Sequence, residues 1–335
     1  MYEAFYRLRA KPFSLNPDPA FFFGSKGHKR AMSYLEYGLH QGEGFIVITG
    51  EVGAGKTTLV RNLFRKLDSG SLVAAQLVST QLDADDTLRM VAASFGLPLE
   101  DKSKAVLLKR LEAFLLACRE QNKRALLVVD EAQNLTPRAV EELRMLSNYQ
   151  AGDGSLLQTF LLGQPEFRVT MQSAGMLQLR QRVIASYHLG PLDAEDTRGY
   201  IEHRLRTVGW QADPTLSEEA YAEIFSFAGG IPRRINTLCD RLLLMGYIEE
   251  KHVLGAPDVK AVIADIQHES AYPEAPVVQA GTANIDAQFT TETETRLGHL
   301  EERTADLERS VTQVLKLLRE ILSLASVRRM RSEDH

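Results

Sequence analysis

The chain has 335 residues, 44% of them hydrophobic, and a formal net charge of −5 at pH 7. This length leaves room for a substantial core, so two folded domains with an appendage are expected. The acidic balance argues against non-specific attraction to nucleic acid over the whole surface. No apolar run approaches the ~20 residues that span a bilayer, and residues 1–10 lack a signal-peptide core, so a cytoplasmic protein is expected.

The two cysteines, Cys118 and Cys239, are far apart in the sequence, and each lies within an apolar helical pattern. Their spacing matches neither a metal site nor a disulfide framework. We therefore expect two buried core thiols in a reducing compartment.

Residues 1–44 are expected to form an arm and a helix that leads into the first strand. Turn signals at 16–19 and three phenylalanines at 21–23 come before a helix-like stretch over 28–41. We expect this arm to pack against the core.

The most specific motif follows an apolar run at 45–48 and precedes a helix-like stretch at 58–64. Its glycines let backbone N–H groups curl around a polyphosphate, Lys56 can reach the outer phosphates, and the Thr57 hydroxyl can bind Mg²⁺. The helix N-terminus adds partial positive charge at the same place. A nucleoside triphosphate is therefore the expected ligand. The predicted nucleotide-binding residues of this loop are Gly50, Glu51, Val52, Gly53, Ala54, Gly55, Lys56, Thr57 and Thr58.

An acidic pair ends a second buried strand. After an apolar strand at 72–78 and helical segments near 85–95 and 104–120, the apolar run 126–129 leads into Asp130 and Glu131. Such a run is typical of a central parallel strand whose carboxyl end faces the ligand crevice. Asp130 is predicted to bind the nucleotide's Mg²⁺ together with Thr57, through water, and Glu131 to polarise the attacking water. The pair therefore predicts hydrolysis in addition to binding.

The following segments complete two domains. A helix over 137–149, with Thr136 as its N-cap, and a strand over 156–163 continue an alternation of strands and helices. This alternation predicts an α/β domain with a mostly parallel sheet over 45–189. From residue 190 the pattern is helical, with Asp193 and Ser217 as N-caps, and predicts a small α-helical lid over 190–267.

The last part of the chain is expected to be a linker and a coiled coil. Residues 268–292 are rich in Ala, Pro, Thr and Gly without periodicity, which favours a flexible linker. Residues 293–328 carry a heptad pattern that predicts a coiled-coil helix, and the alternative is an amphipathic helix docked on the chain's own ATPase domain. The a positions hold Leu297, Thr304, Val311 and Leu318, and the d positions hold Leu300, Leu307, Val314 and Ile321.

The order of strand, phosphate loop, acidic strand and helical lid resembles the AAA+ ATPases, which implies their P-loop NTPase fold. The resemblance is closer to the ExeA/GspA group of secretion-associated ATPases, through residues 16–19, 44–45, 49–53, 130–133 and 163–166. Within that group, residues 39–44, 78–83 and 230–236 look like the ATPase linked to exosortase (XrtA) and PEP-CTERM loci. The resemblance covers roughly residues 1–267.

The resemblance implies three further roles. Gln164 takes the sensor-1 position, where an amide can bridge the lytic water and the γ-phosphate, with a plain polar loop residue as the alternative. Arg182 aligns with an arginine finger supplied to a neighbouring subunit, and Arg180 is the reserve; two surface arginines are the alternative. Arg233 matches sensor 2, a lid arginine that reports the nucleotide state.

The resemblance also implies a place for the adenine, between the arm and the lid, with Phe13 and Pro19 as candidate contacts. ExeA-type ATPases continue into a membrane span and a periplasmic wall-binding domain, and this sequence carries neither motif. We expect the coiled coil to serve assembly or docking instead.

The leading hypothesis is Mg²⁺-dependent ATP hydrolysis by a homo-oligomer. The resemblance implies that it supports secretion or exopolysaccharide export linked to exosortase (PEP-CTERM) sorting, in the cytoplasm and peripheral to the inner membrane through its partners. Two alternatives are a DNA-binding ATPase similar to transposition regulators and a nucleotide-gated scaffold built through the coiled coil. The acidic balance disfavours the first, and an intact Glu131 disfavours the second.

Overall fold

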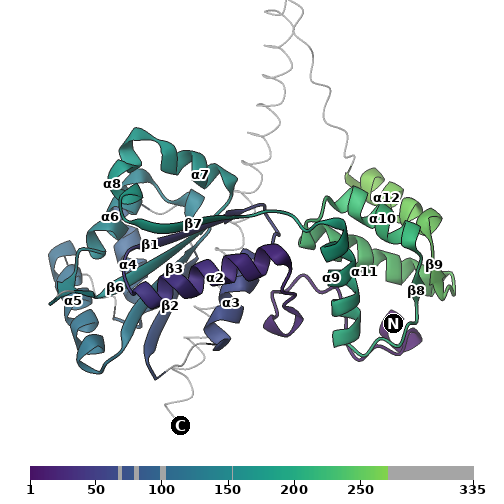
Figure 1. The fold of residues 1–335 in the computed structure, drawn as a ribbon, viewed down its shortest axis with the longest axis horizontal. Helices are drawn as coiled ribbons and strands as arrows, with labels where there is room; N and C mark the ends of the chain where they lie inside the picture. The colour runs from purple at the N-terminus through teal and green to yellow at the C-terminus, as the bar shows by residue number, and fades with distance from the viewer. Residues whose placement is uncertain (67–69, 79–82, 99–102, 153, 271–335) are drawn as a thin grey trace, which may run out of the picture. The chain divides into compact units, whose positions relative to one another are not determined.

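The computed structural model describes residues 1–66, 70–78, 83–98, 103–152 and 154–270, which group into one unit (Figure 1). The predicted coiled coil over 293–328 and nearly all of the predicted linker over 268–292 lie outside the described residues. None of the helices formed by the described residues is long and apolar enough to cross a membrane.

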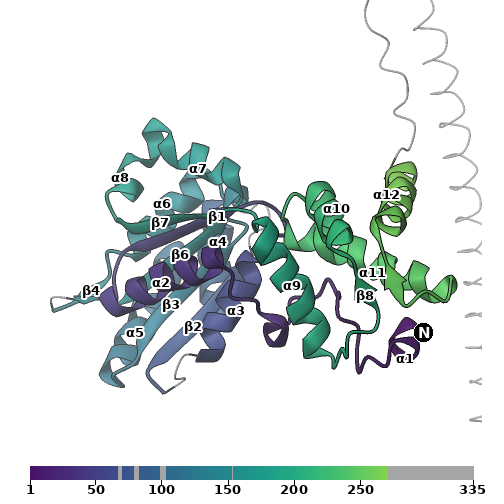
Figure 2. The ribbon, with the colours of Figure 1, turned by 45° about the vertical axis from the view of Figure 1, so that its right-hand side comes forward.

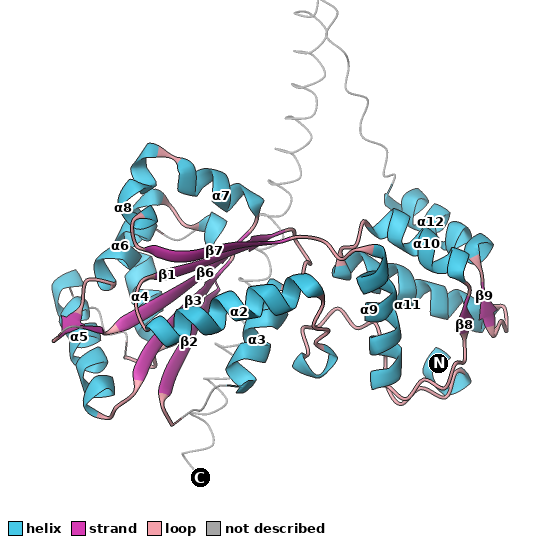
Figure 3. Ribbon diagram, viewed as in Figure 1, coloured by secondary structure: helices cyan, strands magenta, loops and turns pink. Residues whose placement is uncertain are grey.

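A five-stranded parallel sheet forms the centre of the first domain (Figure 3). Its strands, in the spatial order β2-β3-β6-β1-β7, are β2 (Leu72–Val78), β3 (Arg124–Asp130), β6 (Leu157–Gly163), β1 (Phe45–Gly50) and β7 (Val183–Leu189). Every residue of β1 and β6 is buried, which suits the apolar run at the start of β1, while β6 also buries the polar residues Gln158 and Thr159. The predicted strands at 45–48, 72–78, 126–129 and 156–163 are confirmed, whereas β7 was not predicted.

Helices cover both faces of this sheet, and alternate residues of β1 point to opposite faces. Ile46 and Ile48 pack with residues of α2 (Lys26–Gln41) and α3 (Lys56–Lys66). Phe45 and Val47 belong to the core on the other face, under α4 (Ala84–Ser94), α5 (Lys104–Glu120), α6 (Pro137–Leu146) and α7 (Pro165–Gln172). The short elements of this domain are η2 (Ala132–Asn134), β4 (Gln150–Ala151), β5 (Gly154–Ser155), η3 (Ala174–Met176) and α8 (Leu177–Arg180).

Helix α6 starts as predicted and ends early. The Thr136 hydroxyl accepts a hydrogen bond from the Ala139 backbone N–H, which confirms the predicted N-cap. The helix ends at Leu146, three residues before the predicted end; the Ser147 hydroxyl donates to the Arg144 carbonyl, and the chain continues into turns.

The chain from residue 194 onward forms mainly helices, as the sequence predicted, and we refer to this part as the lid. It consists of α9 (Ala194–Thr207), α10 (Glu218–Ala228), α11 (Pro232–Ile248) and α12 (Ala256–Ser270), with the short parallel pair β8 (Thr215–Leu216) and β9 (Val253–Leu254). Asp193 and Ser217 cap α9 and α10 by accepting backbone N–H bonds, as predicted. Cys239 lies in the lid core and Cys118 is a buried residue of α5; both thiols are free.

The amino-terminal segment is divided between the two domains. Helix α1 (Tyr2–Phe5) contacts α11, as Figure 2 shows, and Tyr6, Leu8 and Phe13 are buried in the lid core. The short helix η1 (Pro19–Phe21) contacts α3 and α9, and α2 then packs on the sheet. The predicted single segment 1–44 therefore contributes to two different cores.

A buried arginine fixes the arm to the lid. Arg204 of α9 is 5% exposed. Its guanidinium donates to the carbonyls of Pro12 (2.5 Å) and Ser14 (3.1 Å) and to the Tyr200 hydroxyl (2.7 Å). It also lies 4.7 Å from the centre of the Phe21 ring. Because a buried guanidinium needs such partners and two of them are backbone carbonyls of the arm, these bonds hold the arm to α9.

Candidate functional site

The loop between β1 and α3 has the backbone geometry of a phosphate cradle. Gly53 and Gly55 have φ values of +82° and +98°, a region that side chains with a Cβ rarely adopt. A Cβ at Gly55 would lie 2.8 Å from the His28 ring, and one at Gly53 would collide with Arg233. The two glycines therefore allow the backbone turn and the close approach of two neighbouring elements.

Lys56 opens α3 and is buried, with 6% of its surface exposed. Its ammonium donates to the carbonyls of Gly50 (2.7 Å) and Glu51 (3.0 Å). Burial lowers the pKa of Lys56, and the charges of Glu131 and Asp130 offset part of that effect. An anion bound in the loop would offer this cation a stronger partner than two neutral carbonyls.

Thr57 and Asp130 lie together at the carboxyl end of the sheet, as the sequence predicted for the Mg²⁺ ligands. The Thr57 hydroxyl donates to Asp130 Oδ2 over 2.7 Å, and Asp130 is 4% exposed. No cluster of three or more acidic, histidine or cysteine side chains that could hold a metal is present in the described ranges. This donor set suits Mg²⁺, which prefers one or two protein oxygens with phosphate and water as its other ligands.

Glu131 is held by two amides. Its Oε2 accepts hydrogen bonds from Gln133 Nε2 (2.5 Å) and Gln164 Nε2 (3.0 Å). Burial raises the pKa of Glu131, but these two hydrogen bonds and the charge of Lys56 outweigh it, so the pKa lies below its ordinary value. The carboxylate is therefore ionised and able to accept a proton.

Sequence reasoning missed Gln133 and His28. Gln133 follows Glu131 by two residues in η2, and its contact with Gln164 depends on the neighbouring strand β6. His28 is buried on α2, with Nδ1 2.7 Å from the Ser25 hydroxyl and Nε2 3.1 Å from the Ala54 carbonyl of the phosphate loop. Since a carbonyl can only accept, Nε2 carries the proton and Nδ1 accepts from Ser25. The Ser25 N-cap, just before the predicted helix, was the signal available in the sequence.

We expect His28 to make stability depend on pH. Burial lowers its pKa below the ordinary 6.5, and the Ala54 carbonyl and Asp196 offset part of this. The folded protein thus binds fewer protons, so the contribution of His28 is complete above pH 6.5 and is lost as the pH falls through the lowered pKa. Between about pH 7.5 and about 5.5, Tm should therefore fall more for the parent than for His28→Gln.

Thermal melts of the two proteins at both pH values measure this difference. His40→Gln, at an exposed position of the same helix, is the control and should follow the parent. Parallel slopes for His28→Gln and the parent would show that His28 does not carry the effect.

A cavity of about 470 Å³ joins the phosphate loop, the arm and the lid. Lys56, Thr57 and Glu131 line its phosphate end, and Tyr200 and Asn236 line it from the lid. The arm contributes residues 14–18 and 21–23. Neither adenine candidate is among the lining residues: Phe13 is buried in the lid core, and at η1 the lining includes Asp18 and Phe21 but not Pro19.

Arg233 lies beside the phosphate loop. It is in the first turn of α11, and its backbone N–H donates to the Gly53 carbonyl over 3.2 Å. Its exposed side chain lines the cavity. The lid therefore reaches the loop through the residue proposed to sense the nucleotide.

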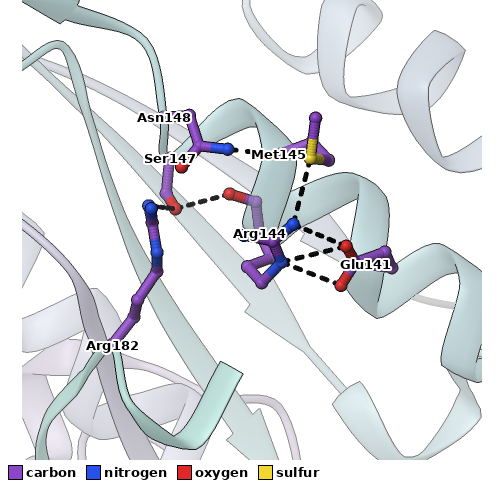
Figure 4. Close-up of polar contacts among 6 residues, drawn as sticks. All are labelled: Glu141, Arg144, Met145, Ser147, Asn148 and Arg182. Carbon is purple, nitrogen blue, oxygen red and sulfur yellow. Dashed lines mark hydrogen bonds and ion pairs between the residues drawn. The ribbon is translucent and has the colours of Figure 1, made fainter. Parts of the chain in front are cut away.

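Arg182 lies away from this site. Its backbone carbonyl accepts a hydrogen bond from the N–H of Phe45, at the start of β1. The phosphate loop follows the other end of β1, and a strand of this length separates the two ends by about 20 Å at about 3.3 Å per residue. Its guanidinium donates to the Ser147 hydroxyl over 2.8 Å (Figure 4). Arg180 donates instead to the carbonyls of Met171 and Ser173, at the end of α7. Neither arginine is brought to the phosphate loop of its own chain.

A known protein family and a known protein share sequence similarity with this chain. Residues 39–171 match the AAA domain family. Over 267 residues the chain is 36% identical to General secretion pathway protein A of Aeromonas hydrophila. The matched region covers 79% of this chain and 48% of that protein. The chain thus spans about half the length of this curated relative.

The fold is similar to that of solved structures, including those of the following two proteins. The ORC2 protein of Aeropyrum pernix matches with a TM-score of 0.58 and 16% identity, covering 76% of this chain and 71% of that chain. Cdc6p of Pyrobaculum aerophilum matches with a TM-score of 0.55 and 15% identity, covering 76% and 70%. The chain therefore has the P-loop AAA fold, and the AAA-domain match together with the 36% identity supports the ExeA/GspA group of secretion-associated ATPases.

Proposed function

We propose that this chain is an Mg²⁺-dependent ATPase that works as a homo-oligomer. The observation that carries the proposal is the shared cavity in which Lys56, Thr57, Glu131 and Arg233 meet. A module that only bound nucleotide would need the loop and its lysine, but not an ionised carboxylate at the edge of the cavity. The arrangement thus supports hydrolysis.

Each residue has a role that its position supports. The loop amides and Lys56 bind the phosphates, and Thr57 and Asp130 hold the metal ion. When bound, Mg²⁺ would neutralise charge on the phosphate oxygens. Glu131 accepts the proton of the attacking water, and Gln164, which is bonded to Glu131, orients that water. Arg233 carries the state of the phosphates into α11 and hence into the lid.

The biological setting rests on likeness rather than on site geometry. The name of the A. hydrophila relative and the motifs at 39–44 and 230–236 support a role in secretion, with export linked to exosortase and PEP-CTERM sorting as the specific proposal. We propose that the protein acts in the cytoplasm beside inner-membrane export machinery, and that residues 293–328 mediate assembly or docking.

Phosphate release by the full chain tests the enzymatic part. We expect turnover of ATP with Mg²⁺ and none with excess chelator, because among the described residues Thr57 and Asp130 would hold the metal together with phosphate and water. Lys56→Ala, purified in parallel, controls for contaminating ATPases. Phosphate release no faster than that of Lys56→Ala would overturn the proposal.

A further inference from the structure

Glu131, Gln133 and Gln164 form a closed ring of hydrogen bonds at the edge of the cavity. Both side-chain amides donate to Oε2 of Glu131, and the Gln133 Oε1 accepts from the backbone N–H of Gln164 over 3.0 Å. Two residues of the loop after β3 are thus tied to the end of β6, and the ring joins the proposed base to the sensor position.

The two amides differ in how firmly they are held. Gln164 directly follows Gly163, the last residue of β6, so its backbone N–H is fixed by the sheet. That N–H can only donate, which forces Oε1 of Gln133 toward it and leaves Nε2 of Gln133 facing Glu131. The Gln164 side chain has no such second attachment among the described residues and can turn while its backbone stays in place.

The carboxylate is oriented without being covered. Both amides bind Oε2, while Oε1 has no hydrogen bond to another described residue, and Glu131 lines the cavity. Glu131 also has a φ of +56°, a left-handed conformation that is uncommon for residues other than glycine and needs support from its surroundings. The ring supplies that support.

We propose that Gln133 is a positioning residue that keeps Glu131 aimed at the attacking water when the Gln164 amide turns to the γ-phosphate. This rests on the proposed ATPase function. Gln133 touches neither water nor nucleotide in this role; it acts through Glu131. Without it, the carboxylate would lose its remaining bond at the moment when the other amide leaves, and a misplacement of about 1 Å can cost about a hundredfold in rate.

Kinetics of Gln133→Met and Gln133→Glu test the proposal. Methionine keeps the volume without the polar atoms, and glutamate keeps the acceptor for the Gln164 N–H but has no donor for Glu131. We expect kcat for ATP to fall about 10- to 100-fold in both variants, with KM and the affinity for a fluorescent ADP within about twofold of the parent. Gln121→Met, at an exposed helix end on the opposite edge of the sheet, should match the parent.

The outcomes separate this inference from the proposed function. If the parent hydrolyses ATP, Glu131→Gln does not, and either Gln133 variant that folds keeps the parent's kcat, the positioning role is wrong. A loss caused by raised KM or weakened ADP binding would also overturn it, because that is the result of a purely structural role. If the parent itself releases no phosphate, the proposed function falls first and takes the inference with it.

Discussion

Replacing Glu131 with glutamine should leave ATP bound and slow its hydrolysis by about 10²- to 10⁴-fold. The substitution keeps the size of the side chain, and its amide oxygen can still accept from both Gln133 and Gln164, but an amide oxygen cannot take a proton from water at neutral pH. Lys56, Thr57 and Asp130 are untouched, so phosphate and metal binding should persist.

Two measurements are needed on the same preparation: phosphate release, and ATP affinity by equilibrium binding in Mg²⁺. Glu120→Gln is the matched control, because Glu120 is exposed at the end of α5. A Glu131→Gln protein that turns over as fast as Glu120→Gln would mean that the base lies elsewhere.

Arg182→Ala should lower turnover by about 10³-fold or more while leaving nucleotide affinity unchanged. Since Arg182 lies at the amino edge of its own sheet, its guanidinium can neutralise phosphate charge only in another copy of the chain. The Ser147 hydroxyl would then be a resting partner, given up when the copies assemble.

Mixing variants gives a sharper result than single substitutions. Neither Glu131→Gln nor Arg182→Ala should be active alone, but their mixture should recover part of the parent's rate, because some interfaces then pair an intact Glu131 with an intact Arg182. Arg206→Ala, on the exposed face of α9, is the control and should keep full turnover. No recovery in the mixture, or a rate for Arg182→Ala that equals the control, would exclude an arginine finger at Arg182. The same two measurements on Arg180→Ala would then test whether Arg180, the reserve candidate, is the finger.

Much of the fold was predictable because its signals are local. The phosphate loop is a contiguous motif, and buried strands such as β3 read as apolar runs. Strand β7 was missed because most of its residues are only partly buried, so they do not form a continuous apolar run. It also begins shortly after the helical residues 177–180. Its alternation from Val183 to Leu189, rich in β-branched and aromatic residues, was the available signal.

The rest depends on contacts between distant parts of the chain. Nothing near Tyr6 in the sequence indicates that its hydroxyl donates to the Lys251 carbonyl, or that Phe13 is buried in a core made by residues beyond 190. The same holds at the site: the roles of His28 and Gln133 depend on which backbone groups the fold brings beside them. Phe13, one of the two candidate adenine contacts, lies in the lid core and not in the cavity lining, since an aromatic residue near a turn is as readily a core residue.

The division of the arm between two cores limits how the lid can rotate. The chain passes between sheet and lid twice, once through residues 15–25 and once through 190–193, and Lys26 joins the two passages. Its backbone N–H donates to Asp196, and its ammonium to Asp193 (3.3 Å) and Glu195 (2.8 Å). Two adjacent connections restrict rotation of the lid to the axis that passes through both of them, whereas a single connection would also permit rotation about other axes. A change at Arg233 would thus reach a lid whose rotation is restricted at these two connections.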